Sequence, residues 1–359
     1  MEAQKGKRHP DHPEHILRYL NRLYNENRRE YSCRATNLAE FEEWQASARP
    51  VLRQLVGLDN IAALADSHRP SVECQDVEDM GHYTRQRCFI ESEPDVRIFF
   101  WLLKPKGKGP FPLAVTPHGH NPHGYNMYVG EVVDEAERDR MVREDRDVAV
   151  QAVEEGFVAI APATRGIAQG GVADISHRHG GSNCRSHLMH CLMAGRTAIG
   201  ERVWDLEHLI TWALTLPEVD GQHILMLGNS GGGMVTTYAA ACDPRVTIAI
   251  PSCSFSSYVG PGGLIHHCDC NMIPGILEFG EFWDVAGLIA PRHLLVVNGR
   301  YDVPRHPPEV VNKATERVRA IFAVAGVPDH FSHQYGDAGH RFYKGIMWPF
   351  VRKVLAKGR

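Results

Sequence analysis

The spacing of apolar residues divides the chain into a helical beginning and a longer part in which strands alternate with helices. Over residues 11–65, apolar side chains recur every three or four positions, which predicts amphipathic helices. From residue 83 the pattern changes to two strand-like runs, 83–91 and 96–104, which a polar turn with Pro94 and Asp95 separates. Two such runs joined by a polar turn predict an antiparallel hairpin.

The rest of the chain repeats a short apolar run followed by an amphipathic segment. The apolar runs predict buried strands, and the amphipathic segments predict helices that cover them. Strands are expected at 113–117, 157–162, 223–229, 246–250, 293–297 and 331–335, and helices at 148–155, 199–215 and 308–325. We therefore expect an α/β protein with a mostly parallel central sheet, helices on both faces and an antiparallel start.

The same pattern sets the expected domain organisation. Residues 1–80 are expected to form a helical extension that packs on the main domain, which spans residues 81–359. A polar insertion is expected near residues 167–195. An independent binding module at the N-terminus is the alternative to a packed extension.

One junction between a strand and a helix carries a motif with chemical meaning. Gly228, Ser230 and Gly232 form a G-x-S-x-G pattern between the apolar run 223–229 and a helix that begins near residue 234. In this context the pattern predicts a sharp turn that lifts the serine hydroxyl clear of the sheet. Glycine is needed on both sides because a side chain there would collide with the neighbouring strand or helix. A glycine-rich turn that merely contains serine is the alternative.

A nucleophilic serine also needs a base and an acid that orients the base. Asp302 follows the predicted strand 293–297, and His340 follows the last predicted strand, in the order Ser, acid, His that this architecture requires. We therefore predict a triad of Ser230, Asp302 and His340. The weaker rivals are Glu278, Glu281 and Asp284, which do not directly follow a strand, His333, which lies inside one, and His306, which is close to Asp302 in sequence.

Acyl transfer further needs hydrogen-bond donors for the oxyanion that develops on the substrate. The backbone N–H of Gly231, next to the serine, is the first expected donor. The loop after the strand 113–117 should supply the second, and by position this is the backbone N–H of His120. A plain tight turn at residues 118–124 is the alternative.

Several polar residues are candidates for contacts with a substrate. Residues 177–187 fall between a strand and a helix, where substrate-binding insertions are placed, and their Arg and His side chains could hold a carboxylate or sugar hydroxyls. A solvated polar loop is the alternative. The candidate substrate-binding residues are His118, Arg165, Arg178, Arg185 and His267.

Residues 266–270, with the sequence His-His-Cys-Asp-Cys, contain side chains of the types that bind metals. Adjacent histidines and a C-x-C pair do not match the usual spacing of zinc ligands. We therefore expect a loop that shapes the pocket, with a metal site as the alternative. No metal or organic cofactor is expected.

Composition narrows the classes of function and partner. The 359 residues are 43% apolar and 23% charged, which is ordinary for a globular protein, and a net charge of -4 gives no reason to expect nucleic acid or an anionic membrane as partner. No apolar run approaches the roughly 20 residues that span a bilayer, and no signal peptide is visible. Nine cysteines scattered over a long chain argue against a disulfide framework and favour a reducing, cytoplasmic location.

With this site in place, residues 80–355 resemble the α/β-hydrolase superfamily, and within it the acetylxylan esterase-like branch near the dienelactone hydrolases. Besides the triad, the resemblance rests on Gly195-Arg196-Thr197, Arg202-Val203-Trp204-Asp205, Leu216-Pro217-Glu218-Val219-Asp220 and the stretches 267–275 and 286–292. One departure is the run 302–307, where such proteins usually continue as Asp-Pro-Ile-Phe-Pro. The pocket wall beside the acid is therefore expected to differ.

The resemblance implies an α/β-hydrolase fold and a serine esterase that cleaves a small acyl ester, such as acetyl, of a sugar or similar alcohol. A lactone hydrolase or a peptidase of the same fold is an alternative. Such peptidases usually carry a propeller or another large gating domain, and this sequence shows no internal repeat of that kind. An inactive hydrolase fold used for binding is an alternative of another class, against which the intact triad argues. A homo-oligomer is compatible with the sequence.

Overall fold

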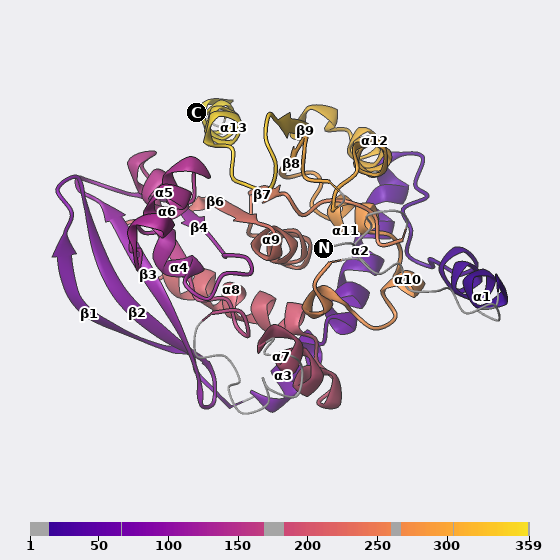
Figure 1. Cartoon of the computed structure of the whole chain (residues 1–359), viewed down its shortest axis with the longest axis horizontal. Helices are drawn as coiled ribbons and strands as arrows, with labels where there is room; N and C mark the ends of the chain where they lie inside the picture. The colour runs from indigo at the N-terminus through magenta and orange to yellow at the C-terminus, as the bar shows by residue number, and fades with distance from the viewer. Residues whose placement is uncertain (1–13, 66, 169–182, 260–266, 304, 358–359) are drawn as a thin grey trace, which may run out of the picture.

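The computed structural model describes residues 14–65, 67–168, 183–259, 267–303 and 305–357. Their centre is a nine-stranded sheet with the strand order β1-β2-β3-β5-β4-β6-β7-β8-β9. Figure 1 shows the sheet running across the molecule, from β1 at one edge to β9 near the other. The expected fold class, a mixed and mostly parallel sheet with helices on both faces, is confirmed.

The sheet combines an antiparallel edge with a parallel centre. In the antiparallel part, β1 pairs with β2, β2 with β3, and β3 with β5; the strands from β4 onward pair in parallel. The bounds are β1 Ser71–Asp79, β2 Tyr83–Glu93, β3 Val96–Pro105, β4 Phe111–Val115, β5 Val158–Pro162, β6 Val219–Asn229, β7 Ile248–Ser252, β8 His293–Gly299 and β9 Phe331–Gly336.

Helices occupy both faces of this sheet (Figure 1). None of the described helices is both long and apolar enough to cross a membrane. The bounds are α1 Glu14–Asn25, α2 Leu38–Leu55, α3 Leu58–Leu64, α4 Gly124–Met127, α5 Glu135–Arg143, α6 Val148–Glu154, α7 Asn183–Met193, α8 Ala198–Ala213, α9 Gly231–Cys242, α10 Ile276–Phe279, α11 Phe282–Gly287, α12 Pro308–Val324 and α13 Lys344–Lys357, with short 3-10 turns η3 Asp269–Asn271 and η4 Pro328–His330.

The alternation of side chains along each strand produces two separate apolar cores. On β6, Ile224 and Met226 pack with α2, α8, α9, α11 and α12, whereas Leu225 and Leu227 pack with α4, α6 and α13 on the opposite face. Successive residues of a strand point to opposite faces, so a strand covered on both sides needs an unbroken apolar run. This is the pattern by which the parallel strands were predicted.

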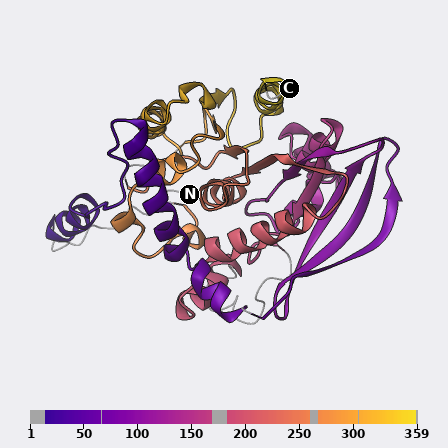
Figure 2. The same ribbon diagram turned by 180° about the vertical axis from the view of Figure 1, so that it is seen from behind.

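The N-terminal residues add helices to one face and a strand to the edge of the sheet. Asn37 caps α2 by accepting a hydrogen bond from the Glu40 N–H at 3.0 Å, and α2 packs along α9. In Figures 1 and 2, α1 lies at the periphery, far from the β1 edge. The sequence predicts helices over residues 11–65 within a helical extension that ends at residue 80, whereas residues 71–79 of this extension form β1.

One cysteine pair is joined where the sequence had argued against a disulfide framework. Cys74 and Cys88 form a disulfide between β1 and β2. The antiparallel register places the two residues directly opposite each other, with their Cα atoms 4.0 Å apart. The count of cysteines could not reveal this pairing because it depends on the position of β1. Seven cysteines remain as free thiols.

Candidate active site

Ser230 lies at the sharp turn between β6 and α9. Its backbone has a φ of 58° and a ψ of -122°, a positive φ that is strained for any residue with a Cβ. The Ser230 N–H donates to the Ser252 carbonyl at 2.8 Å, and its own carbonyl accepts from the Met234 N–H at 3.0 Å, which begins the helix. The turn therefore presents the hydroxyl beyond the carboxyl end of the sheet, as the G-x-S-x-G pattern predicts.

Close packing explains the glycines around this serine. A Cβ on Gly232 would lie 2.0 Å from the carbonyl oxygen of Pro117, and one on Gly228 would lie 2.5 Å from the backbone of Gly232. Real Cβ atoms do not approach backbone atoms this closely, so only glycine fits at either position. The turn is thus pressed against the loop that follows β4.

That loop is the one expected to supply the second oxyanion donor. A Cβ on Gly119 would lie 3.1 Å from the Gly231 nitrogen, and one on Gly231 would lie 2.9 Å from Nδ1 of His120. The backbone at Gly119 therefore runs beside the Gly231 N–H, and the His120 ring lies over Gly231. The structure brings the two predicted oxyanion residues together; their catalytic role stays a prediction.

Asp302 and His340 meet beyond the ends of β8 and β9. The Nδ1–H of His340 donates to Oδ2 of Asp302 at 2.6 Å. Asp302 is buried, whereas His340 is partly exposed. The neighbouring strands β8 and β9 are parallel, so their carboxyl ends lie side by side. Residues 38 positions apart in sequence therefore come into contact there.

His306, which the sequence reasoning set aside, also binds Asp302. Its Nδ1 lies 2.9 Å from the same Oδ2 atom. The ring is buried, and its Nε2 has no hydrogen-bond partner among the described residues. His306 stacks nearly parallel to His340, with 6.3 Å between ring centroids, and lies nearly perpendicular to His267 at 4.9 Å. Its position four residues after Asp302, which makes it a weaker candidate for the base, is the only signal for this contact in the sequence.

These contacts set the charges in the site. Burial pushes the pKa of Asp302 upward, but hydrogen bonds from His306 and His340 outweigh burial and hold that pKa well below its usual range. Asp302 is therefore ionised at neutral pH. Burial lowers the pKa of His306, and it lowers the pKa of His267 to about 3, with the neighbouring His306 adding to the shift. His306 and His267 are therefore neutral at pH 7.

Ser230 and His340 line the same cavity, which has a volume of about 360 Å³. Gly231 and His120 also line it, so the predicted nucleophile, base and oxyanion donors share one space. The described residues around this cavity include three arginines and five histidines but no carboxylate. The arginines are Arg140, Arg146 and Arg305, and the histidines are His118, His120, His267, His306 and His340. Such an arrangement can hold a polar molecule beside the Ser230 hydroxyl.

Among the candidate substrate-binding residues, His118 and His267 line this cavity. His118 is buried: its Nε2 accepts the Thr164 N–H at 2.9 Å, and its Nδ1–H donates to the Gly119 carbonyl at 2.8 Å. Burial lowers the pKa of His118 to about 3, so the ring is neutral. Both ring nitrogens therefore hold the loop after β4 in place.

The candidate arginines are placed differently. Arg185, on α7, is half exposed and pairs with Asp269. Arg178 lies outside the described residues. In the predicted insertion near residues 167–195, the described residues 183–193 form the helix α7.

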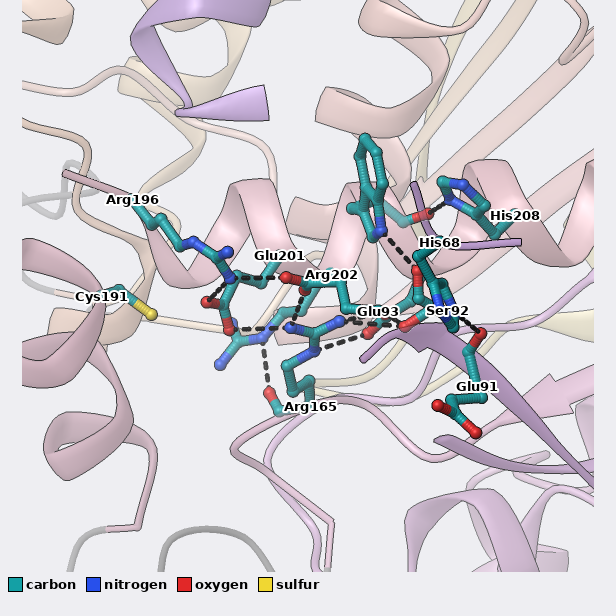
Figure 3. Close-up of polar contacts among 12 residues, drawn as sticks. His68, Glu91, Ser92, Glu93, Arg165, Cys191, Arg196, Glu201, Arg202 and His208 are labelled. Atoms are coloured by element: carbon teal, nitrogen blue, oxygen red, sulfur yellow. Dashed lines mark hydrogen bonds and ion pairs between the residues drawn. The ribbon is translucent and has the colours of Figure 1, made fainter. Parts of the chain in front are cut away.

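Arg165 belongs to a buried cluster of ion pairs and is not among the residues that line the cavity with Ser230. Its guanidinium lies 2.7 Å from Glu93 and 3.2 Å from Glu201, and it also pairs with Asp205. Figure 3 shows Arg165 and Arg196 converging on Glu201 from two sides. These contacts favour a structural role for Arg165 over the contact with substrate that the sequence suggested.

The chain is similar to known proteins in sequence and in structure. No family profile matches it. A Bacillus subtilis (strain 168) protein named "Putative hydrolase YtaP" is 21% identical over 300 residues, which cover 82% of this chain and 94% of that protein. A structure described as a "putative acetyl xylan esterase" from Bacteroides fragilis NCTC 9343 matches with a TM-score of 0.71 at 15% identity, covering 98% of this chain and 97% of the other. The chain has the α/β-hydrolase fold.

A second solved structure supports the same conclusion. A glucuronoyl esterase from Solibacter usitatus matches with a TM-score of 0.62 at 13% identity, over 88% of this chain and 93% of the other. In an α/β-hydrolase fold, the nucleophile, acid and base follow different strands in that order. Ser230 after β6, Asp302 after β8 and His340 after β9 occupy such positions.

Proposed function

We propose that the protein is a serine hydrolase that cleaves a carboxylic ester. The observation that carries the proposal is the hydrogen bond of 2.6 Å between His340 and the buried Asp302, with His340 and Ser230 lining one cavity. A buried carboxylate behind an imidazole stabilises the positive charge that the ring acquires when it takes a proton. A role in binding alone would require neither this pair nor the strained turn at Ser230.

The proposed reaction follows from these positions. His340 takes the proton of the Ser230 hydroxyl through Nε2, because its Nδ1–H is held by Asp302, and Ser230 attacks the ester carbonyl. The backbone N–H groups of Gly231 and His120 stabilise the oxyanion. His340 then gives its proton to the departing alcohol. Water activated by the same imidazole attacks the acyl-enzyme and releases the acid.

The substrate proposed is a small acyl ester, such as acetyl, of a sugar or a similar alcohol. The similarity to a structure described as an acetyl xylan esterase supports a carbohydrate ester. The cavity of about 360 Å³ lies at the small end of the range for ligand pockets, which favours a short acyl group. A lactone would use the same nucleophile and oxyanion donors. Lactone hydrolysis is therefore the second candidate activity.

Hydrolysis of p-nitrophenyl acetate tests the proposal. The wild-type protein is expected to turn over this ester, and Ser230→Ala is expected to lose at least about 10⁴-fold in kcat, because no other group supplies the nucleophile. Ser47→Ala, on the exposed side of α2, is the matched control and should keep the wild-type rate. Full turnover by Ser230→Ala would show that the nucleophile is wrong. A panel of acetylated sugars, longer acyl esters and lactones then ranks the substrate classes.

A further inference from the structure

Four side chains with sulfur or imidazole donors converge beside the candidate active site. They are His120 from the loop after β4, Cys184 from the first turn of α7, and Cys268 and Cys270 from the segment around η3. Their donor atoms all lie within 4.8 Å of one another. Nε2 of His120 is 3.2 Å from Sγ of Cys270, and Sγ of Cys184 is 3.3 Å from Sγ of Cys268.

We propose that these four residues form a zinc site of the three-cysteine, one-histidine type. In a tetrahedral zinc site the Zn–S bonds are about 2.3 Å, which puts neighbouring sulfur atoms about 3.8 Å apart. Two of the separations are 3.2 and 3.3 Å and none of the others exceeds 4.8 Å, so small rotations of the side chains would bring the four donors to tetrahedral positions. Three sulfurs and one imidazole nitrogen are ligands that favour zinc over calcium or magnesium.

The charge of the surroundings supports an ion at this place. Arg202 on α8 is buried, and its Nη1 donates to Sγ of Cys270 at 3.4 Å. Its Nη2 has no hydrogen-bond partner among the described residues. Three thiolates, one divalent cation and this guanidinium sum to zero net charge, whereas beside neutral thiols Arg202 would be a buried charge with no carboxylate partner among the described residues.

Two other groups of metal-binding residue types are worse candidates. In the first, His187, Cys191 and Glu201, the carboxylate is already paired with Arg165 and Arg196. The second, Cys253 with Asp302 and His340, belongs to the proposed catalytic residues. The group around Cys270 is therefore the one of the three that combines sulfur and nitrogen donors without a carboxylate.

The proposed ion is structural. Because all four coordination positions are filled by side chains, none is open for water or substrate. The site ties together three segments that are distant in sequence, and two of them line the cavity with Ser230 through His120 and Cys268. The backbone N–H of His120 stays available as an oxyanion donor, since only its ring nitrogen binds the metal. Zinc would thus fix the loop that carries this donor.

The sequence did not reveal the site because its ligands are dispersed. The C-x-C spacing within residues 266–270 does not match a zinc motif, and His120 and Cys184 lie 150 and 84 residues away from their partners Cys270 and Cys268. Only the fold shows that the four belong together.

Metal analysis of the protein tests this proposal independently of any esterase activity. Protein purified with a thiol reductant and without chelator is expected to hold about one zinc ion per chain, measured by mass spectrometry of the metal. The variant with both Cys268→Ser and Cys270→Ser is expected to lose at least about nine tenths of the zinc. Cys33→Ser, which removes a thiol outside the cluster, is the matched control and should retain it.

Cobalt gives a second readout that needs no variant. After exchange with Co²⁺, the wild-type protein is expected to show the intense sulfur-to-cobalt charge-transfer bands that thiolate coordination produces. The proposal is overturned if wild-type protein holds no zinc after incubation with zinc chloride, if the double variant binds as much as the wild type, or if the cobalt protein lacks these bands. A disulfide between Cys184 and Cys268 in protein kept under reductant would overturn it as well.

Discussion

At the scale of single residues, Asp302 has two imidazole partners on one oxygen atom. Both rings line the cavity, but His340, at 2.6 Å, is partly exposed, whereas His306, at 2.9 Å, is buried. Two N–H donors stabilise the ionised carboxylate, which is why its pKa is held low although burial acts in the opposite direction. We infer that His306 fixes the carboxylate in the orientation from which it holds His340.

Replacing His306 tests this contact. His306→Leu removes a hydrogen bond to a charged group and is expected to lower the free energy of unfolding by about 1.5–3 kcal/mol. His306→Asn can keep an N–H donor near the Nδ1 position and is expected to lose less. Urea unfolding of the two variants and the wild type measures the difference. Equal stability of all three proteins would show that the 2.9 Å contact contributes nothing.

His118 makes the stability of the protein depend on pH. The pKa of its buried ring is lowered to about 3 by burial, and the positive charge of Arg202 acts in the same direction. The unfolded chain binds a proton at this residue below about pH 6.5, whereas the folded chain does so only near pH 3. Stability is therefore lost as the pH falls through this window.

The size of this effect can be measured by replacement. Between pH 7 and pH 5, protonation of His118 in the unfolded chain is expected to lower the free energy of unfolding by about 2 kcal/mol, because each pH unit below the unfolded pKa of about 6.5 costs about 1.36 kcal/mol. His118→Gln removes the titrating ring, so its loss of stability over the same interval should be smaller than that of the wild type by about this amount. The same pH dependence in both proteins would contradict a neutral, buried His118.

At the scale of elements, the turn between β6 and α9 is held by contacts that leave no room for a side chain. Gly232→Ala is expected to destabilise the protein by several kcal/mol or to displace the turn, because the new Cβ would lie 2.0 Å from the Pro117 carbonyl oxygen. Gly345→Ala in α13 is the matched control, since nothing lies within 4 Å of its added Cβ and alanine favours a helix. Urea unfolding of both variants checks this; equal effects would contradict the packing described.

The sequence predicted the elements that carry their own apolar pattern. The hairpin of β2 and β3 and the buried parallel strands were found because each is a run of apolar residues between polar turns. The strand β1 was missed because all but one of its residues are exposed, so that it joins the sheet through backbone pairing with no apolar signal. The helix α5 was missed for a similar reason, since it buries only Met141.

The candidate site was predicted as far as its residues follow from position along the strands. Ser230, Asp302 and His340 each come after a strand, and the structure brings Asp302 and His340 into contact and places Ser230 and His340 on one cavity. His306 and the group around Cys270 depend on how loops fold back on one another. Nothing in the local spacing of residues specifies such contacts, so the sequence alone could not yield them.

At the scale of the whole molecule, segments that are far apart in sequence converge at the carboxyl end of the parallel strands. The strands β6, β8 and β9 run parallel, so the loops after them meet at this end. The loop after β4 arrives at the same place and packs against Gly231. We propose that this convergence makes Ser230 the nucleophile of an esterase.

Covalent labelling with a p-nitrophenyl phosphonate tests that claim most directly, because such reagents react with a serine that an adjacent base activates. Peptide mass spectrometry of the labelled wild-type protein is expected to find one adduct per chain, on Ser230, and His340→Ala should react far more slowly. An adduct on a different residue, or none in a protein that hydrolyses esters, would contradict the account.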